Sequence, residues 1–172
     1  PGAANNAAAQ VFAGKDTVDD CVSAVNGNVT LTRPVSQINV YTTTESLSFG
    51  AVNIGLDESS MTVAGLYNTF NVATGDAVVS DENKATFEYT EAPVPTVAAD
   101  NTDLTYVAMN YVGFAPKAGA TVTVDFTINT SEAVDIDHSV SNVPVKPNYR
   151  TNIVGNLISA TADYNVTLGA WG

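Results

Sequence analysis

The sequence predicts an all-β protein that folds as a β-sandwich, with at most one short helix near the N-terminus. Three observations support this fold class. Only 14% of the residues are charged, so Thr, Ser, Asn and Asp provide much of the polar surface, and these residues suit strands and turns better than helices. Several segments alternate apolar and polar side chains with a period of two. In two segments this alternation slips, as happens where strands change sheets in a sandwich.

Residues 1–27 are predicted to form an N-terminal segment that contains the short helix. The apolar side chains that recur there at the spacing of one helical face are Val18, Cys21, Val22 and Val25. Gly27 can end such a helix. Cys21 is the only cysteine, so no disulfide can form within the chain. A lone cysteine is more often a small buried apolar residue than a nucleophile.

Residues 28–172 are predicted to form one sandwich domain. The clearest strand is ATVTVDFTI (120–128), and KATFEYT (84–90) alternates in the same way. DLTYVAMNYVGF (103–114) is apolar on both faces, which predicts a strand that is covered on both sides. The alternation slips near Pro34 and again near Gly65, and each slip predicts a bulge or a change of sheet.

Composition argues against several classes of partner. Eighteen Asp and Glu face six Lys and Arg, which gives a formal net charge of −12. Nucleic acid is therefore not expected as a partner, because phosphate contacts need clustered cations. The same charge disfavours adsorption on an anionic membrane. No stretch approaches the ~20 apolar residues of a membrane-spanning helix, so direct membrane insertion is not expected either.

No catalytic group of residues emerges, and we expect a protein that is not an enzyme and has no cofactor or metal. His138 is the only histidine, and its neighbours Asp137 and Ser139 cannot converge on it, because adjacent strand residues point to opposite faces. The oxygen-rich segments 81–83 and 100–103 lack the calcium-loop pattern and are interpreted as solvated turns. Phosphate-binding loops and the G-x-S-x-G motif are also missing from the sequence.

The segment NVPVKPNYRTNIVGNL (142–157) is expected to be a strand that follows a turn stiffened by proline. Pro144 and Pro147 have no N–H for a central ladder, so strand pairing is expected to begin after Pro147. Arg150 is expected to pair with a carboxylate or with backbone carbonyls at a seam of the sheet, rather than with an external ligand.

Two segments together carry a family resemblance. VTLTRPVSQINVYT (29–42) is similar to an L-x-R-P-x-A-Q-(I/L)-N-V strand, and 142–157, followed by YNVTL, is similar to a VP-(L/V)-x-x-N-Y-R-T-N-I-x-G-x-L segment. Both motifs are found in the Bacteroidetes fimbrillin-like family, whose C-terminal portion the chain resembles from about residue 28 to its end. The matching positions, to which the resemblance assigns a structural role, are Arg33, Pro34, Gln37, Asn39, Asn148, Tyr149, Arg150, Thr151, Asn152 and Gly155.

The resemblance implies a Greek-key or transthyretin-like β-sandwich that serves as a structural or accessory subunit of a type V pilus, acting in assembly and adhesion. In polymerising members, proteolysis removes an N-terminal strand, and an extended strand from a neighbouring subunit fills the groove. The implied partners are neighbouring pilin subunits or copies of the chain, together with a host surface protein or glycan. The implied location is the cell surface, fimbrial or anchored at the outer membrane, reached as a lipoprotein precursor whose signal is not in this chain.

The candidate donor strand is the terminal ADYNVTLGAWG, in which Tyr164, Val166 and Leu168 alternate before Trp171. The alternative is that this tail pairs within its own domain as a terminal strand. A second function also stays open, that of a glycan-binding cell-surface lipoprotein module, which would need exposed aromatic rings such as those of Trp171, Tyr106 and Tyr111. A hydrolase has the least support, because no base or nucleophile is positioned.

Overall fold

The structure is a computed structural model that describes residues 11–15, 29–49, 52–95, 103–132, 134–158 and 163–171. The helix predicted within 1–27, including Cys21, lies outside these residues, and the predicted boundary at residue 28 stays a prediction. Helical structure in the described part consists of two short 3-10 turns, η1 (Thr44–Leu47) and η2 (Asp81–Asn83). Neither turn has the length and apolar character that crossing a membrane requires.

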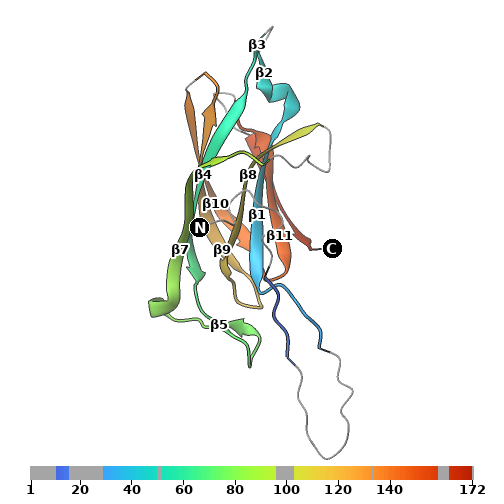
Figure 1. The fold of residues 1–172 in the computed structure, drawn as a ribbon, viewed down its shortest axis with the longest axis vertical. Helices are drawn as coiled ribbons and strands as arrows, with labels where there is room; N and C mark the ends of the chain where they lie inside the picture. Colours follow the sequence, from blue (N-terminus) through green and yellow to red (C-terminus); the bar gives the residue numbers. More distant parts are fainter. Residues whose placement is uncertain are drawn as a thin grey trace, which may run out of the picture.

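The rest of the described chain is dominated by strands, which confirms the all-β prediction. They are β1 (Val35–Thr43), β2 (Ser48–Phe49), β3 (Val52–Asn53), β4 (Leu56–Tyr67), β5 (Phe70–Asn71), β6 (Asp76–Ala77), β7 (Lys84–Pro93), β8 (Leu104–Phe114), β9 (Ala120–Thr130), β10 (Asp135–Val145), β11 (Tyr149–Asn156) and β12 (Asp163–Ala170). The short pairs β2–β3 and β5–β6 form hairpins of their own at opposite ends of the molecule (Figure 1).

The long strands form two layers of a sandwich (Figure 1). One layer has the antiparallel order β7-β4-β9-β10, and the other has the order β8-β1-β11-β12. A single residue pair, Tyr67 with Phe114, joins β4 to β8 and makes the layers one continuous sheet. Within the second layer β1 and β11 run parallel, although more than a hundred residues separate them along the chain (Gln37 pairs with Arg150). Consecutive strands therefore change layers repeatedly along the chain.

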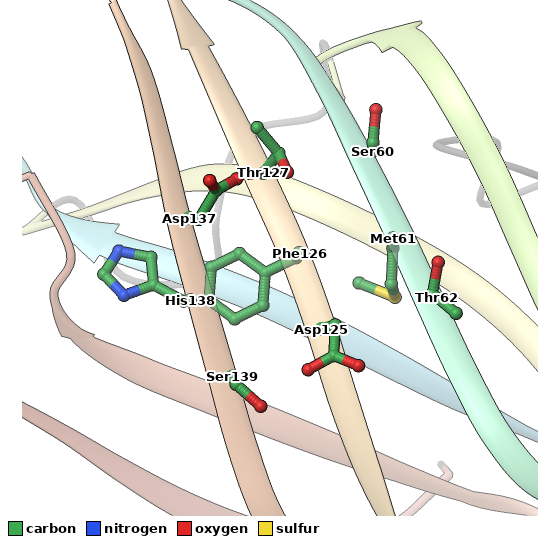
Figure 2. Close-up of a pocket in the computed structure, with 9 residues that line it drawn as sticks. All are labelled: Ser60, Met61, Thr62, Asp125, Phe126, Thr127, Asp137, His138 and Ser139. Carbon is green, nitrogen blue, oxygen red and sulfur yellow. Dashed lines mark hydrogen bonds between the residues drawn. The ribbon is translucent and has the colours of Figure 1, made fainter.

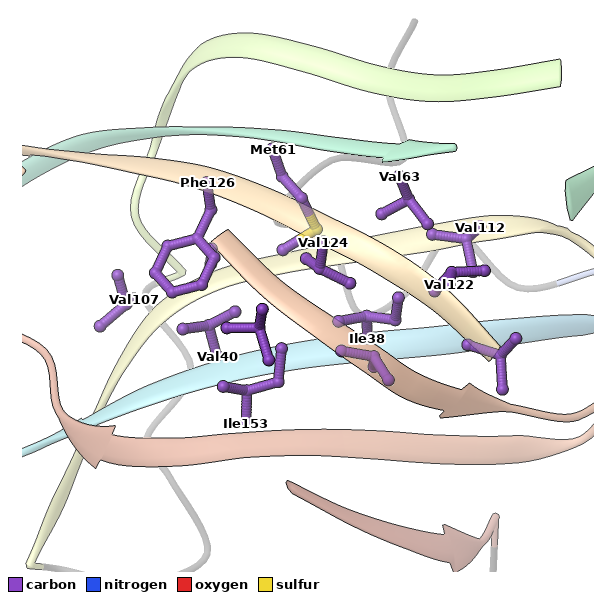
Figure 3. Packing of buried hydrophobic residues seen from close by; sticks show 14 of the residues in the cluster. Ile38, Val40, Met61, Val63, Val107, Val112, Val122, Val124, Phe126 and Ile153 are labelled. Atoms are coloured by element: carbon purple, nitrogen blue, oxygen red, sulfur yellow. The ribbon is translucent and has the colours of Figure 1, made fainter. Parts of the chain in front are cut away.

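The hydrophobic core lies between the two layers (Figure 3). Ile38 and Val40 of β1 are fully buried and belong to the same cluster as Val124 and Phe126 of β9. In β9 the buried and more exposed residues alternate from Thr121 to Thr130, which confirms the strand predicted there. Burial of this apolar surface is the main stabilising contribution to such a fold.

Both predicted slips of alternation coincide with irregular strand pairing. The register between β4 and β7 shifts between Ala64 and Leu66, and Gly65 between them has a φ of 94°, a backbone conformation that glycine adopts without strain. The register between β1 and β8 shifts directly after Pro34, at Val35. The prediction that β8 is covered on both faces is also confirmed, because residues 107–110 are all buried.

The predicted start of pairing after Pro147 is confirmed for one strand and wrong for another. β11 begins at Tyr149 as expected. β10, however, continues through Pro144, which pairs with Thr121 of β9. β10 is the last strand of its layer among the described residues, and an edge strand tolerates proline because one side of its backbone needs no partner.

Candidate functional site

The two sequence motifs lie side by side in the structure. β1 carries the first motif and β11 the second, and their parallel register sets Gln37 opposite Arg150 and Asn39 opposite Asn152. These four residues therefore share one face of the β1–β11 pair, the face turned away from the core residues Ile38 and Ile153. The motif seam is the group formed by these residues and the side chains that contact them: Gln37, Asn39, Arg150 and Asn152, with Arg33, Tyr106, Tyr111 and Trp171.

Amide side chains connect the two strands of the motif seam. Nε2 of Gln37 donates to Oδ1 of Asn39 at 2.7 Å, and Nδ2 of Asn39 donates to Oδ1 of Asn152 at 2.8 Å. The hydroxyl of Tyr106 on β8 also donates to Oδ1 of Asn39. Gln37 and Asn39 are only 3% and 2% exposed, so these bonds satisfy polar groups that would otherwise be costly to bury. Two buried atoms in the seam have no hydrogen-bond partner, Oε1 of Gln37 and Nε of Arg150.

Trp171 closes one end of the motif seam and is only 6% exposed. The guanidinium of Arg33 lies 4.4 Å from its ring centroid and that of Arg150 lies 5.0 Å away. The ring of Tyr111 stacks on Trp171 at 5.5 Å with an interplanar angle of 8°. Two cations and a second aromatic ring thus hold the indole, an arrangement stabilised by the negative face of its π-system.

The prediction that Arg150 pairs with a carboxylate or with backbone carbonyls was wrong. Within the described ranges the one salt bridge joins Lys84 to Asp81 at 2.7 Å, and Arg150 instead lies over the ring of Trp171. A guanidinium is weakly hydrated and planar, so it stacks on an aromatic face at low desolvation cost. Arg150 therefore holds the indole that directly follows β12 and has no carboxylate partner in the seam.

The remaining motif residues shape the turn that leads into β11. Asn148 has a φ of 61°, in the left-handed region that asparagine tolerates better than most residues. Its carbonyl accepts the backbone N–H of Trp171 at 3.0 Å, and its side chain lies 3.5 Å from Nη1 of Arg33. The hydroxyl of Thr151 donates to the carbonyl of Pro144. The ring of Tyr149 lies 4.9 Å from the ammonium of Lys146.

β12 forms the outer edge of the second layer and pairs antiparallel with β11. Val166 is opposite Ile153 in that register, so the inner face of β12 carries Tyr164, Val166 and Leu168. Tyr164 and Leu168 are 41% and 38% exposed, and the polar residues on the other face are exposed as well. The terminal strand is thus paired along one edge and lightly covered on both faces.

Gly155 sets the distance between β11 and β12. A Cβ on this residue would overlap the carbonyl oxygen of Asp163 and the Cα of Tyr164. We expect Gly155→Ala to lower the free energy of unfolding by about 1 to 3 kcal/mol and to speed hydrogen exchange of β12 amides. Gly169→Ala is the matched control on the neighbouring strand, because a Cβ there meets nothing within 4 Å. Equal exchange in the two variants would contradict this role for Gly155.

A shallow hollow of about 380 Å³ lies along β4, β9 and β10 (Figure 2). Its polar lining includes Ser60, Thr62, Asp125, Asp137 and Ser139, and no Lys or Arg. The hydroxyl of Thr127 donates to Asp137 at 2.7 Å. Hydroxyls and carboxylates in rows on a sheet surface can accept and donate hydrogen bonds, but the hollow contains no nucleophile held by a base.

The ring of His138 forms its hydrogen bond with a backbone carbonyl, and not with the carboxylates beside it in the sequence. Its Nε2 donates to the carbonyl of Leu157 at 2.7 Å, and its ring lies 5.1 Å from the ring of Phe126. Asp137 and Ser139 flank it on an alternating strand and are exposed. The described residues contain no group of three or more His, Cys, Asp or Glu that could hold a metal ion.

The other candidates from the sequence occupy unremarkable places. Asp81 pairs with Lys84, and the ammonium of Lys84 lowers the pKa of that carboxyl. In the segment 100–103, Asp103 is exposed, and residues 100–102 lie outside the described residues. Trp171 is buried and Tyr106 and Tyr111 are half-buried, so these rings do not form the exposed row that the glycan-binding alternative requires.

The buried phenol of Tyr106 predicts a dependence of stability on alkaline pH. Burial, and then the neighbouring Tyr41, raise the pKa of Tyr106 above its ordinary value of 10.0. The unfolded chain releases this proton near pH 10 and the folded chain holds it, so the free energy of unfolding is unaffected below that pH and falls above it. Tyr106→Phe should make the fall less steep in urea titrations between about pH 8 and 11. Identical slopes would contradict this assignment.

A model of a family of unknown function, DUF6562, matches residues 2–170. None of the curated proteins matches.

Some solved structures of Bacteroides proteins are similar to the chain at low identity. A candidate cell adhesion protein from Bacteroides uniformis is 14% identical, with a TM-score of 0.44, over 84% of this chain and 53% of that one. A second one, from Bacteroides ovatus, is 12% identical with a TM-score of 0.49, over 83% and 47%. A fimbrial protein from Bacteroides vulgatus is 10% identical with a TM-score of 0.35, over 84% and 56%. The chain thus spans about half the length of these proteins.

Proposed function

The chain belongs to the DUF6562 family, a family of unknown function, and we propose that it is a non-catalytic structural or accessory subunit of a bacterial surface fimbria. The motif pair that resembles fimbrillin-like proteins supports this proposal. The motif residues contact one another and Trp171, so these polar side chains have a structural use that joins β1, β11 and the residue after β12.

The observation that carries the proposal furthest is the state of β12. This strand is the edge of its layer, alternates apolar residues on its inner face and is largely exposed. Strand addition between subunits uses such edges, because the backbone provides affinity and alternate side chains fit pockets. In the proposed assembly β12, or the edge that it occupies, joins a neighbouring pilin subunit or a second copy at the cell surface.

Paired charge substitutions on the two faces of β12 test the assembly role. Tyr164→Lys with Leu168→Lys places charges on the inner face, and Asn165→Lys with Thr167→Lys adds the same charge to the other face. If the inner face fills a groove, the first variant abolishes the heat-sensitive ladder of surface material on denaturing gels, whereas the second retains it. Deletion of residues 163–172 should behave like the first variant. An unchanged ladder after that deletion would remove β12 from the assembly.

A further inference from the structure

Charged residues divide between the two ends of the sandwich. The end near β5 is where β1, β7, β9 and β11 begin, and the end near β2 is where these strands finish (Figure 1). All six Lys and Arg of the chain belong to the β5 end: they are Lys15, Arg33, Lys84, Lys117, Lys146 and Arg150. The described carboxylates at this end are Asp76, Asp81 and Glu82, so its described charge is net positive. The β2 end carries only carboxylates among its described charged residues: they are Glu45, Asp57, Glu58, Asp103, Glu132, Asp135 and Asp163.

The β5 end also has a groove with apolar surroundings. An arm formed by residues 11–15 and 29–33, held by backbone bonds between Ala13 and Thr32, lies beside the β5–β6 hairpin. The groove between them measures about 240 Å³. Phe70 and Val72 contribute apolar surface to its lining, and the arm also carries the exposed apolar side chains Val11, Phe12, Val29 and Leu31. Lys15 and Lys117 line the groove, and their ammonium groups donate to the carbonyls of Ala73 and Thr74.

The β2 end presents a protrusion of complementary character. Val134, in the turn between β9 and β10, is 54% exposed. Glu132 lies two residues before it and Asp135 directly after it, and both are exposed. An apolar side chain flanked by two carboxylates is complementary to a small groove that Phe70 and Val72 line together with Lys15 and Lys117, because an apolar contact with opposite charges around it is the pattern of a specific interface.

We infer that the β9–β10 turn of one copy of this chain docks in the groove at the β5 end of the next copy. Such a contact joins two different surfaces, so it repeats head to tail and produces a linear array. The net charge of −12 opposes side-by-side association of copies, while the segregated cations permit this one direction of approach. This contact rests on the proposed role as a fimbrial subunit. It is separate from strand addition at β12, which uses neither the groove nor the β9–β10 turn.

Cross-linking between mixed isotopic copies tests the contact directly. Unlabelled and ¹⁵N-labelled chains are mixed and treated with a carbodiimide, which joins an ammonium to a carboxylate without a spacer. β9 has eleven residues and is about 35 Å long, so opposite ends cannot be linked within one copy. We expect mixed-label products that join Lys15 or Lys117 to Glu132 or Asp135. Absence of mixed-label products, or products spread equally over Glu88 and Asp125, would overturn the inference.

Charge reversal provides the matched control. Glu132→Lys with Asp135→Lys should weaken self-association in sedimentation experiments roughly tenfold. Glu88→Lys with Asp125→Lys changes the net charge equally in the middle of the sheet, and should leave association unchanged or stronger. Lys15→Glu with Lys117→Glu should restore binding to the first variant. If surface filaments contain the chain but ignore these reversals, only the end-to-end contact fails; if no filament contains the chain, the proposed function itself fails.

Discussion

Trp171→Ala is expected to lower the free energy of unfolding by about 3 to 5 kcal/mol and to free β12 from β11. The indole is 6% exposed and lies against the guanidinium groups of Arg33 and Arg150. Because both faces of β12 are otherwise lightly covered, this ring is the principal side-chain anchor of the terminal strand. Urea denaturation measures the stability loss, and hydrogen exchange of residues 163–170 measures the release of the strand.

Leu168→Ala is the control for that variant. Leu168 is on the same strand but is 38% exposed, so its truncation should cost below about 1 kcal/mol and leave exchange of β12 nearly unchanged. Comparable losses for the two variants would show that Trp171 is no special anchor. Such a result would also remove the reason for two arginines to converge on the chain terminus.

Asn39→Leu is expected to lower the free energy of unfolding by about 4 kcal/mol. The substitution leaves Gln37, Tyr106 and Asn152 without their hydrogen-bond partner. Each polar group that loses its partner in a buried setting costs about 1 to 3 kcal/mol, and Asn39 itself is 2% exposed. Leucine has the same number of side-chain heavy atoms as asparagine, branched at the same carbon, so the shape of the side chain is kept while its hydrogen bonds are lost.

Thr127→Val is the control that tests whether loss of any side-chain hydrogen bond lowers the free energy of unfolding as much as Asn39→Leu does. Thr127 donates to Asp137 on the exposed face of the other layer, where water replaces a lost partner, so the variant should lose about 1 kcal/mol or less. Denaturant titrations of both variants provide the comparison. A loss for Asn39→Leu as small as that for Thr127→Val would mean that the motif seam does not hold β1 and β11 together.

Local sequence patterns predicted the parts of the fold that depend on neighbouring residues. Alternation placed β9, and the slip at Gly65 marked a true bulge, because both features concern residues that are adjacent along the chain. The parallel pairing of β1 with β11 could not be predicted from these patterns, since a register between distant strands leaves no local period. The two motifs were recognised as a pair in the sequence, but only the structure sets Asn39 against Asn152.

The seam also contains partners that sequence reasoning missed. Arg150 was expected to pair with a carboxylate or with backbone carbonyls at a seam of the sheet, yet its guanidinium lies over the indole of Trp171, twenty-one residues later in the chain. The available signal was that three of the six Lys and Arg, namely Arg33, Lys146 and Arg150, fall within the two motif segments. The gathering of Lys and Arg at one end of the sandwich could not be predicted either, because the end at which a residue lies depends on the direction of its strand.

Immunogold electron microscopy of surface material from cells that produce the chain tests the fimbrial role most directly. We expect antibodies against the described sandwich to label filaments at regular intervals, and the same material to show a ladder on gels that collapses to a single band after heating. Label that is confined to filament-free surface or to soluble monomer would contradict the account.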